Sequence, residues 1–345
     1  MDNEEYKSLI GKLDILEEEN LSIKKWQGDV TGLLGKMIKN AEKSQRDIEV
    51  LKHLNYINSI RVESMPYELR DEEVSSSVFV PAFLTAKETR DDVILRKKSI
   101  GRYGDGEFGI IAGIQRWNFQ RKSDKLAERL LEVLKADDDD FLVGLNTTFY
   151  RNLEDLPEIE ADAVREYMRP SVRKMHAKIL DINKVYADAR CFSIHTQEEV
   201  DEIRGLWDQR DCIFVEGKYT RMGIGNDLFD NCGSIKRILC PAENAFDKYD
   251  EILEAVKKMP KDALVLLALG PTATVLAYDL YKAGYWAVDI GHIDLYYEKM
   301  IRNLERLDYV AIPYKYCNGD EVGDKRIIQD VEDDEYSRQI VEVIT

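Results

Sequence analysis

The chain has 345 residues and a formal charge of −17 at pH 7. This length is enough for one large domain or two smaller ones with an ample core. The negative charge argues against nucleic acid or an anionic membrane surface as a partner, because the summed field repels polyanions. It leaves room for a small phosphorylated ligand, since a local arginine, a metal ion and a helix N-terminus can bind a diphosphate inside an acidic protein.

The cysteines and the amino terminus indicate the compartment. The five cysteines include no C-x-x-C pair and their number is odd, which favours a reducing compartment over a disulfide framework. The four histidines are too scattered for a zinc cluster. The first residues are acidic, and no apolar run reaches transmembrane length. We therefore expect a soluble, cytoplasmic protein without a transmembrane segment.

Residues 1–60 predict a helical segment that joins copies of the chain. The 4-3 spacing of a coiled coil is followed by Leu9, Leu13, Leu16, Ile23, Val30, Leu34, Met37, Ala41, Ile48 and Leu51. Polar Asn20, Gln27 and Ser44 interrupt this seam. The natural interpretation is a coiled coil that forms a homo-oligomer. Two alternatives are a helical hairpin packed on its own domain and two helices hinged in the glycine-containing stretch 28–35.

Residues 61–77 are expected to be a linker. This stretch is polar and contains Pro66 and the run D-E-E-V-S-S-S. Residues 78–345 should then form the globular domain.

The globular part alternates predicted strands and helices. Strands are expected at Ser99–Tyr103, Phe141–Leu145, Arg190–Ser193, Cys212–Glu216, Ile235–Cys240, Ala263–Leu269 and Trp286–Ile290. Helices are expected at Lys125–Lys135, Pro157–Ile182, Glu198–Gln209, Tyr249–Lys258 and Thr272–Ala283, and another ends within Asp91–Lys98. Such alternation predicts an α/β fold with a mostly parallel sheet and helices on both faces.

The stretch Ser99–Ala112, S-I-G-R-Y-G-D-G-E-F-G-I-I-A, is the first candidate site. Asp105 and Glu107 are carboxylates one residue apart in a tight turn, and they can converge on one hard cation. The glycines around them, among them Gly104 and Gly106, let the backbone approach a ligand closely. Arg102 suits phosphate oxygens. The alternative is an ordinary solvated acidic turn.

A second candidate follows a predicted buried strand. The stretch Val215–Phe229, V-E-G-K-Y-T-R-M-G-I-G-N-D-L-F, carries a dense set of charged and polar groups among glycines. They are Glu216, Lys218, Arg221, Asn226 and Asp227, and Gly223 is one of the glycines. Because the carboxyl ends of strands bind ligands in open α/β sheets, the stretch predicts ligand contacts. An internal ion-pair network explains the same residues equally well.

A third candidate lies at the end of another predicted strand. In Leu267–Leu280, Gly270 permits a sharp turn, and Thr272 and Thr274 place hydroxyls beside the first-turn N–H groups of a helix. This arrangement is typical of an anion site and also of many ordinary strand–helix turns.

The last candidate is Gly284–Glu298. A histidine with several carboxylates fits acid–base work or metal ligation, and the residues are Asp289, His292, Asp294 and Glu298. A helix-capping aspartate and a structurally hydrogen-bonded histidine are the alternative.

Taken together, these stretches resemble the GT-D-type glycosyltransferases, enzymes that glycosylate bacterial adhesins and build surface polysaccharides. The strings that carry the resemblance are R-Y-G-D-G-E-F, V-E-G-K-Y-T-R-M-G-I-G-N-D-L-F, P-A-E-N-A-F-D-K-Y, L-A-L-G-P-T-A-T-V-L-A-Y-D-L and D-I-G-H-I-D-L-Y-Y-E. They run in order from about Leu84 to the carboxyl end. The stretch Lys315–Asp324 departs from the family pattern, so acceptor contacts are expected to differ there.

The resemblance implies a Rossmann-like domain of the GT-D type that binds a UDP-sugar, with Mn²⁺ or Mg²⁺ on a D-x-E motif formed by Asp105 and Glu107. It implies transfer of a hexose, with glucose expected, to a glycan or glycoprotein acceptor. Glu298 is the first choice as general base, His292 the second and Asp294 the third. Donor contacts are expected from Arg102, Gly104, Gly106, Arg221, Gly223, Asn226, Gly270, Thr272 and Thr274. A catalytically silent nucleotide-sugar-binding scaffold is the alternative function.

Overall fold

The computed structural model describes residues 3–68, 80–114, 119–307, 310–317 and 328–345, with the side chains of residues 3–17 and of residue 20 left out. It separates into two compact units, residues 1–65 and residues 66–345. Each unit is described by itself below. No helix in the described residues is long and apolar enough to cross a bilayer.

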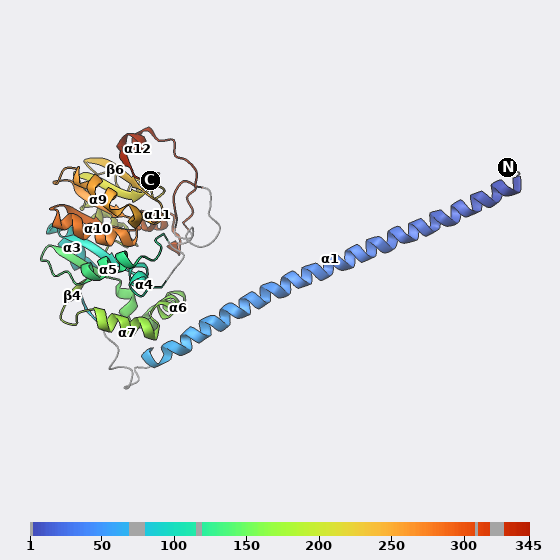
Figure 1. Ribbon diagram of the computed structural model, residues 1–345, viewed down its shortest axis with the longest axis horizontal. Helices are drawn as coiled ribbons and strands as arrows, with labels where there is room; N and C mark the ends of the chain where they lie inside the picture. The colour runs from blue at the N-terminus through green and yellow to red at the C-terminus, as the bar shows by residue number, and fades with distance from the viewer. Residues whose placement is uncertain (1–2, 69–79, 115–118, 308–309, 318–327) are drawn as a thin grey trace. The chain divides into compact units, whose positions relative to one another are not determined.

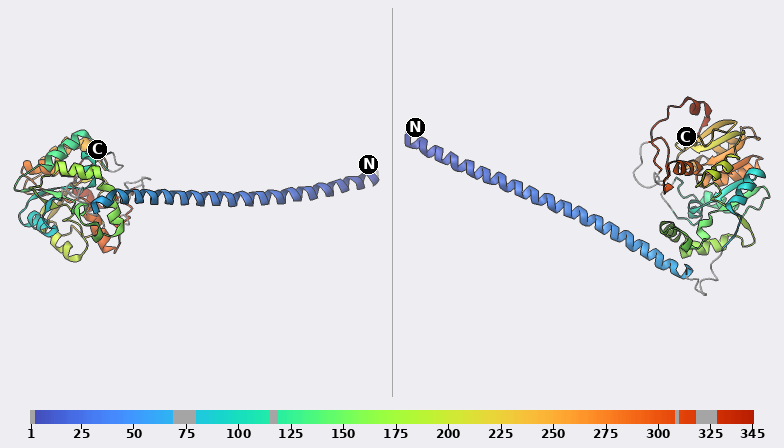
Figure 2. Two further views of the ribbon diagram at one scale, coloured as in Figure 1. Left: turned by 90° about the horizontal axis from the view of Figure 1, so that it is seen from below. Right: turned by 180° about the vertical axis from the view of Figure 1, so that it is seen from behind.

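The first unit is one continuous helix. Helix α1, Asn3–Glu68, has 66 residues and passes through the glycine-containing stretch without a break (Figures 1 and 2). The structure therefore contains neither the hairpin nor the hinge that the sequence left open. The helix also continues past residue 60, so residues 61–68 of the predicted linker are helical. The remainder of that linker, residues 69–77, lies outside the described residues. Within the single chain, the seam residues Ile23, Leu34 and Met37 are more than half exposed, at 53%, 53% and 61%.

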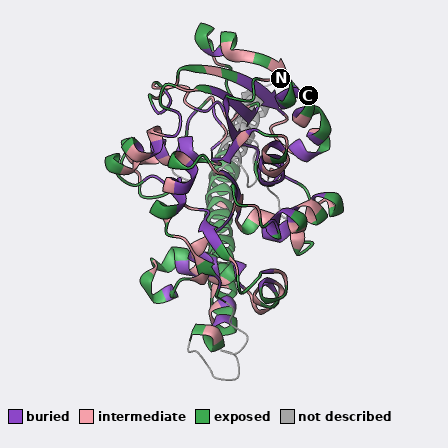
Figure 3. Cartoon of the chain, turned by 90° about the vertical axis from the view of Figure 1, so that its left-hand side faces the viewer, coloured by how far each residue is buried: buried purple, intermediate pink, exposed green. Residues whose placement is uncertain are grey.

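The second unit is built on a nine-stranded sheet in which every neighbouring pair is parallel, in the order β1-β4-β3-β2-β8-β7-β5-β6-β9 (Figure 1). The strands are β1 (Ala82–Phe83), β2 (Ser99–Tyr103), β3 (Phe141–Leu145), β4 (Val185–Asp188), β5 (Asp211–Gly217), β6 (Ser234–Cys240), β7 (Leu264–Ala268), β8 (Trp286–Asp289) and β9 (Ile340–Val343). The inner strand β7 is buried along its whole length, as a parallel strand covered on both faces must be. Figure 3 shows buried residues gathered in the interior of the second unit.

Helices cover both faces of this sheet. The helices are α3 (Ala86–Leu95), α4 (Asp105–Ile111), α5 (Asp124–Leu134), α6 (Glu158–Tyr167), α7 (Pro170–Ile179), α8 (Gln197–Arg204), α9 (Tyr249–Lys257), α10 (Pro271–Lys282), α11 (Ile293–Ile301) and α12 (Asp334–Gln339). On one face α10 packs on β2 and β8 and also contacts α5 and α9. On the other face α3, α8 and α11 contribute to a second apolar core. The predicted α/β architecture, a parallel sheet between two helical layers, is confirmed.

Two predicted elements differ from the structure. Arg190–Ser193 is a turn rather than a strand, and the strand of this region, β4, ends at Asp188. Cys191 and Phe192 of this turn are fully buried in the second core. Two adjacent buried apolar residues look like part of a strand in the sequence, which explains the wrong prediction. The stretch 157–182 is mostly helical, as predicted, but as two helices, α6 and α7, because Pro170 begins the second one.

The strand order creates two crevices at the carboxyl edge of the sheet. The chain leaves β2 toward β3 on one side, whereas it leaves the neighbouring strand β8 through α11 toward β9 on the other. It likewise leaves β7 toward β8 and the neighbouring strand β5 toward β6. Ligands in open α/β sheets bind at such points of divergence. Both crevices contain a cavity.

Candidate active site

The crevice between β2 and β8 contains a polar cavity of about 280 Å³. We call it the polar cavity. Its lining includes Arg102, Asp105, Glu107, Gly270, Arg190 and His292. Residues from three predicted motifs, which are far apart in sequence, thus meet in one place because their strands end at the same edge of the sheet.

The two carboxylates of the first motif have different environments. Helix α4 begins at Asp105, directly after Gly104, and Asp105 is exposed. The Glu107 carboxylate instead accepts a hydrogen bond from the Gly104 N–H at 2.6 Å, which closes the first turn of the helix. Removal of this carboxylate from water raises the pKa of Glu107 to about 7. A bound cation would favour the charged form of this group.

These carboxylates fit a cation that shares its ligands with a substrate. Among the described residues, no set of three or more His, Cys, Asp or Glu side chains converges on one point. The protein would therefore supply the pair Asp105 and Glu107, and phosphate oxygens and water would complete the shell. Mg²⁺ is commonly bound in this way, by one or two carboxylates together with substrate phosphates.

Arg102 forms the floor of the polar cavity. Its guanidinium contacts Asp289 of β8 at 3.3 Å and donates to the Ala189 carbonyl at 3.0 Å. Gly291 lies against it with φ +50°, and a Cβ at this position would be 2.0 Å from Arg102 Nη2. A glycine is therefore required at position 291 for the guanidinium to occupy this place. Arg102 lines the polar cavity, and its contact with a ligand stays a prediction.

His292 lies between the two crevices. It precedes α11, and its side chain borders both the polar cavity and the neighbouring cavity at the ends of β5 and β7. The cleft walls remove water from the imidazole, and this lowers the pKa of His292 below its usual value. Repulsion by the positive Arg102 guanidinium lowers it further. The imidazole is therefore neutral at pH 7, and it can accept a proton or a hydrogen bond.

Glu298 is not in the cleft. It is 1% exposed; its Oε1 accepts from Asn226 at 2.7 Å, and its Oε2 accepts from Arg302 at 2.8 Å. Asp294 accepts from the same Asn226 at 2.9 Å and from the buried Lys315 at 2.5 Å. We call Asn226, Asp294, Glu298, Arg302 and Lys315 the α11 network. Because both Glu298 oxygens are engaged and the residue lines neither cavity of the cleft, the geometry argues against its choice as the general base.

Residues of the stretch after β5 that were predicted to contact a ligand form hydrogen bonds and ion pairs within the protein. Arg221 donates to the carbonyls of Tyr314 and Gln329 at 2.7 Å each. Gly223 N–H donates to Asp294 at 2.9 Å, and Asn226 belongs to the α11 network. Buried Glu216 pairs with Arg237 at 2.5 Å. The ion-pair alternative therefore describes this stretch. Arg221, Gly223 and Asn226 line neither cavity of the cleft, and Gly223 and Asn226 instead border a separate cavity of about 750 Å³ next to Tyr336 and Gln339.

The two threonines of α10 also face inward. Thr274 Oγ1 donates to the Arg102 carbonyl at 2.8 Å, and Thr272 Oγ1 donates to Gln120 at 3.3 Å. Both residues are fully buried. An anion at this turn would meet Gly270 and the backbone N–H groups of the helix start, rather than the two hydroxyls. Gly104, Gly106 and Gly270 line the polar cavity, and their contacts with a donor stay a prediction.

Residues 100–319 match the family of glycosyltransferases with the GT-D fold. The chain belongs to this family. It is 33% identical over 225 residues to the probable glycosyl transferase Gly of Streptococcus gordonii, and 30% identical over 261 residues to the glycosyltransferase GlyD of Streptococcus pneumoniae serotype 4. These matches cover 62% and 74% of the chain, but the chain spans only about a third of either relative, 32% and 31%.

Solved structures of the same domain are similar to this chain. A structure described as a new glycosyltransferase, domain of unknown function 1792, from Streptococcus sanguinis is similar with a TM-score of 0.70 and 30% identity. The similarity covers 77% of this chain and 100% of that one. A second structure of this domain, described as having a distinct glycosyltransferase fold, matches with the same score and covers 96% of that chain. The predicted family is thereby confirmed.

Several residues of this member of the GT-D family that border the cleft were not singled out from sequence. They are Phe119, Arg190, Asn244, Tyr296 and Tyr316. Asn244 lies in the string P-A-E-N-A-F-D-K-Y and Tyr316 in the departing stretch Lys315–Asp324, so both were within view without an assigned role. Phe119 and Tyr316 come from loops without a hydrophobic period, which is why pattern reading missed them. Residues 318–324 of the departing stretch lie outside the described residues.

Proposed function

We propose that this glycosyltransferase transfers a hexose, glucose in the first instance, from a UDP-sugar to a glycan or glycoprotein acceptor, with Mn²⁺ or Mg²⁺ bound beside the donor diphosphate. The observation that supports this most is the polar cavity, where Arg102, the carboxylates of α4 and the amino-terminal end of α10 face one space. This combination suits a diphosphate that brings its own cation.

The residues would divide the work as follows. Asp105 and Glu107 would hold the cation, which neutralises the charge that develops on the leaving diphosphate. Arg102 would bind phosphate oxygens, and its pairing with Asp289 holds the guanidinium in place. The backbone N–H groups at the start of α10 add a fixed positive potential at the same end of the cavity.

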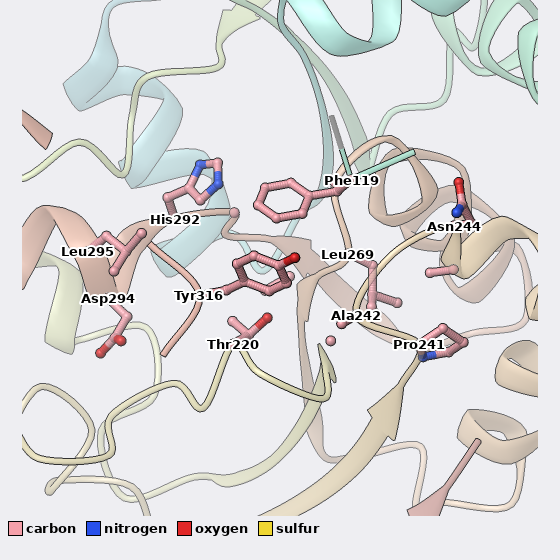
Figure 4. A pocket seen from close by; sticks show the side chains of 15 residues that line it. Phe119, Thr220, Pro241, Ala242, Asn244, Leu269, His292, Asp294, Leu295 and Tyr316 are labelled. Atoms are coloured by element: carbon pink, nitrogen blue, oxygen red, sulfur yellow. The ribbon is translucent and has the colours of Figure 1, made fainter. Parts of the chain in front are cut away.

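His292 replaces Glu298 as the preferred acid–base residue in this proposal. It is the accessible one of the three residues predicted for this role, and it borders the polar cavity. As a neutral imidazole it can take the proton of an acceptor hydroxyl, or orient that hydroxyl. Asp294 borders the neighbouring cavity, but its carboxylate points away from the rings of Phe119 and Tyr316 (Figure 4). It is hydrogen-bonded within the α11 network instead.

We also propose that α1 joins two or more copies of the chain in a coiled coil. The 4-3 seam runs along one uninterrupted helix, and its described apolar members such as Leu34 and Met37 are exposed in the single chain. Long helices gain most of their stability by burying an apolar stripe against a partner.

The test of donor and metal uses the full chain with UDP-glucose and a titration of Mn²⁺. Asp105→Asn removes a charged oxygen from the proposed cation site, so hydrolysis of the donor should fall by roughly 100-fold or more at low Mn²⁺. Asp124→Asn is the matched control, because Asp124 is also the first residue of a helix but lies in α5, and its rate should not change.

Equal rates for Asp105→Asn and the wild-type chain at low Mn²⁺ would remove the metal from the proposal. Binding of UDP-glucose without hydrolysis or transfer to any acceptor would instead favour the nucleotide-sugar-binding scaffold.

A further inference from the structure

Helix α1 carries charged side chains on both sides of its apolar seam. In a heptad written a to g, the seam residues occupy positions a and d, and positions e and g flank them. Leu34 is at position a and Met37 at position d, and the same count assigns every residue from 18 to 65. A seam alone is compatible with partner helices that run in the same or in opposite directions, whereas the flanking residues distinguish the two.

We propose that the seam is covered by a second copy of α1 that runs in the same direction and in register, so that each seam residue meets its own counterpart. This inference rests on the proposed coiled coil and adds its direction and register. Three features of the helix support it: the flanking charges, the polar residues within the seam and the apolar residues beside it.

The flanking charges match only in a parallel pair. Within residues 18–59, the charged g positions are Glu19 and Asp47, and the charged e positions are Lys24 and Lys52. A parallel, in-register pair brings each g residue beside the e residue five positions later on the partner helix. Glu19 then faces Lys24, and Asp47 faces Lys52. An antiparallel pair brings g beside g and e beside e, so acid would meet acid and base would meet base.

These four charged side chains are available to a partner helix. All four are exposed. Within the described part of the chain, none of them forms an ion pair. Because such pairs lie at the surface of a coiled coil, each contributes little affinity, and their main effect is on the direction and choice of the partner.

The polar residues of the seam match only in register. Among the described side chains, positions a and d hold four polar residues, Gln27, Ser44, Asn55 and Asn58. In register each meets its own counterpart, whereas a shift by one heptad would place Gln27 against Leu34. The gaps between the four, 17, 11 and 3 residues, differ when they are read backwards, so no antiparallel register pairs them all. A polar group buried against an apolar one is costly, which favours the parallel register.

Apolar residues widen the seam near its middle. Leu33 is at position g and Ile38 at position e, and they are 62% and 58% exposed in the single chain. The parallel register brings Leu33 of one helix to Ile38 of the other, next to Leu34 and Met37. The glycines of the stretch 28–35 weaken an isolated helix, and they lie at the outer positions b and f. The widest contact therefore lies where the helix most needs a partner.

The direction of the pair decides which ends of the two helices meet. The glycosyltransferase domain follows the carboxyl end of α1 in the chain. A helix of 66 residues is on the order of 100 Å long. An antiparallel pair would separate the two carboxyl ends by about this length, whereas a parallel pair brings them together. Two catalytic domains that continue from one end can act on neighbouring sites of one acceptor chain, because binding of the first raises the effective concentration of the second.

The test traps the pair as a disulfide in the full chain, with oxidised glutathione as the oxidant. Ser44→Cys and Val30→Cys each place a thiol in the seam, and both should give a covalent dimer on a non-reducing gel. Two distant positions are needed, because in an antiparallel pair only one point along the helix meets its own counterpart. Ser22→Cys and Val50→Cys make the same substitutions at outer positions c, and these matched controls should stay uncrosslinked, like the wild-type chain.

A charge exchange tests the flanking pairs directly. Asp47→Lys should raise the dissociation constant of the assembly by roughly 2- to 30-fold, because like charges then meet at two symmetry-related places. Asp47→Lys combined with Lys52→Asp restores the attraction and should return the constant to within about threefold of wild type. The measurement is sedimentation equilibrium of the full chain.

Each other outcome has a defined consequence. A disulfide at only one of the two seam positions, or at neither, in a chain that light scattering shows to be oligomeric would overturn the parallel register and leave the coiled coil standing. A double charge variant that assembles no more tightly than Asp47→Lys would overturn the flanking pairs. A wild-type chain that is monomeric at every concentration would instead overturn the proposed coiled coil itself.

Discussion

The polar cavity and the α11 network are both rich in charged side chains at the carboxyl edge of the sheet, but they differ in how the charges are paired. In the network, buried Asp294 and Glu298 are matched by Lys315, Arg302 and the Asn226 amide. In the cavity, Asp105 is exposed, Glu107 is paired through a backbone N–H, and His292 remains accessible.

The difference has a physical origin. A buried charge must be compensated within the fold, since removing it from water costs several kcal/mol. A charge in an accessible cleft keeps its hydration until a ligand replaces the water. Dense charge at a strand end therefore indicates a ligand site only where the fold has left the charges accessible. This criterion separates the stretch after β2 from the stretch after β5, which look equally promising as sequences.

The largest expected effect comes from breaking the paired region. Lys315→Met leaves the Asp294 and Glu298 carboxylates buried without their shared cation and should lower the free energy of unfolding by about 3–5 kcal/mol. Lys218→Met removes an exposed lysine from the loop after β5 and should change it by less than about 0.5 kcal/mol. Urea unfolding of both variants checks the difference, and similar stabilities would show that the network is not a compensated unit.

The sequence could predict the strands whose apolar runs are unbroken. The stretch 263–269 reads as a buried strand because β7 is covered on both faces, and β2 and β3 fall on the residues expected. The two-residue strand β1 and the edge strand β9 carry too few residues to form a pattern. Their existence depends on pairing with β4 and β6, which only the folded sheet provides.

The sequence could predict which charged residues lie near the candidate site, but not which of them are paired with residues far away in the chain. Arg102, Asp105, Glu107 and His292 could be found because Arg102 lies near the end of a predicted strand and the other three follow predicted strands. The burial of Glu298 could not, because its partner Asn226 is 72 residues away in the chain. A local pattern cannot show whether a distant residue will neutralise a charge, so it could not show that Glu298, the first choice as general base, is buried and hydrogen-bonded.

A smaller effect is expected on sugar transfer, and it differs between a residue of the cleft and a residue of the α11 network. His292→Asn should lower sugar transfer by roughly 10²-fold or more, because the accessible imidazole near the polar cavity is the proposed proton acceptor. Glu298→Gln should lower it by less than about tenfold in the folded protein, because its carboxylate pairs with Arg302 and Asn226 and lines neither cavity of the cleft. The measurement is kcat for transfer, beside donor Kd in the same preparations. A larger loss of kcat in Glu298→Gln, with donor Kd unchanged, would return the base to Glu298.

Helix α1 is the opposite case to the α11 network, because it exposes an apolar seam instead of burying matched charges. If that seam is covered by further copies of the chain, Leu34→Asp should lower the subunit count measured by light scattering, since a charge would enter the seam. Lys39→Asp, a charge change of similar chemistry outside the seam, should leave the count unchanged. Donor hydrolysis should be the same in both variants, because the residues of α1 line neither cavity. Identical subunit counts for Leu34→Asp and the wild-type chain would exclude the coiled coil, and a loss of hydrolysis that follows the loss of assembly would show that the cleft depends on the oligomer.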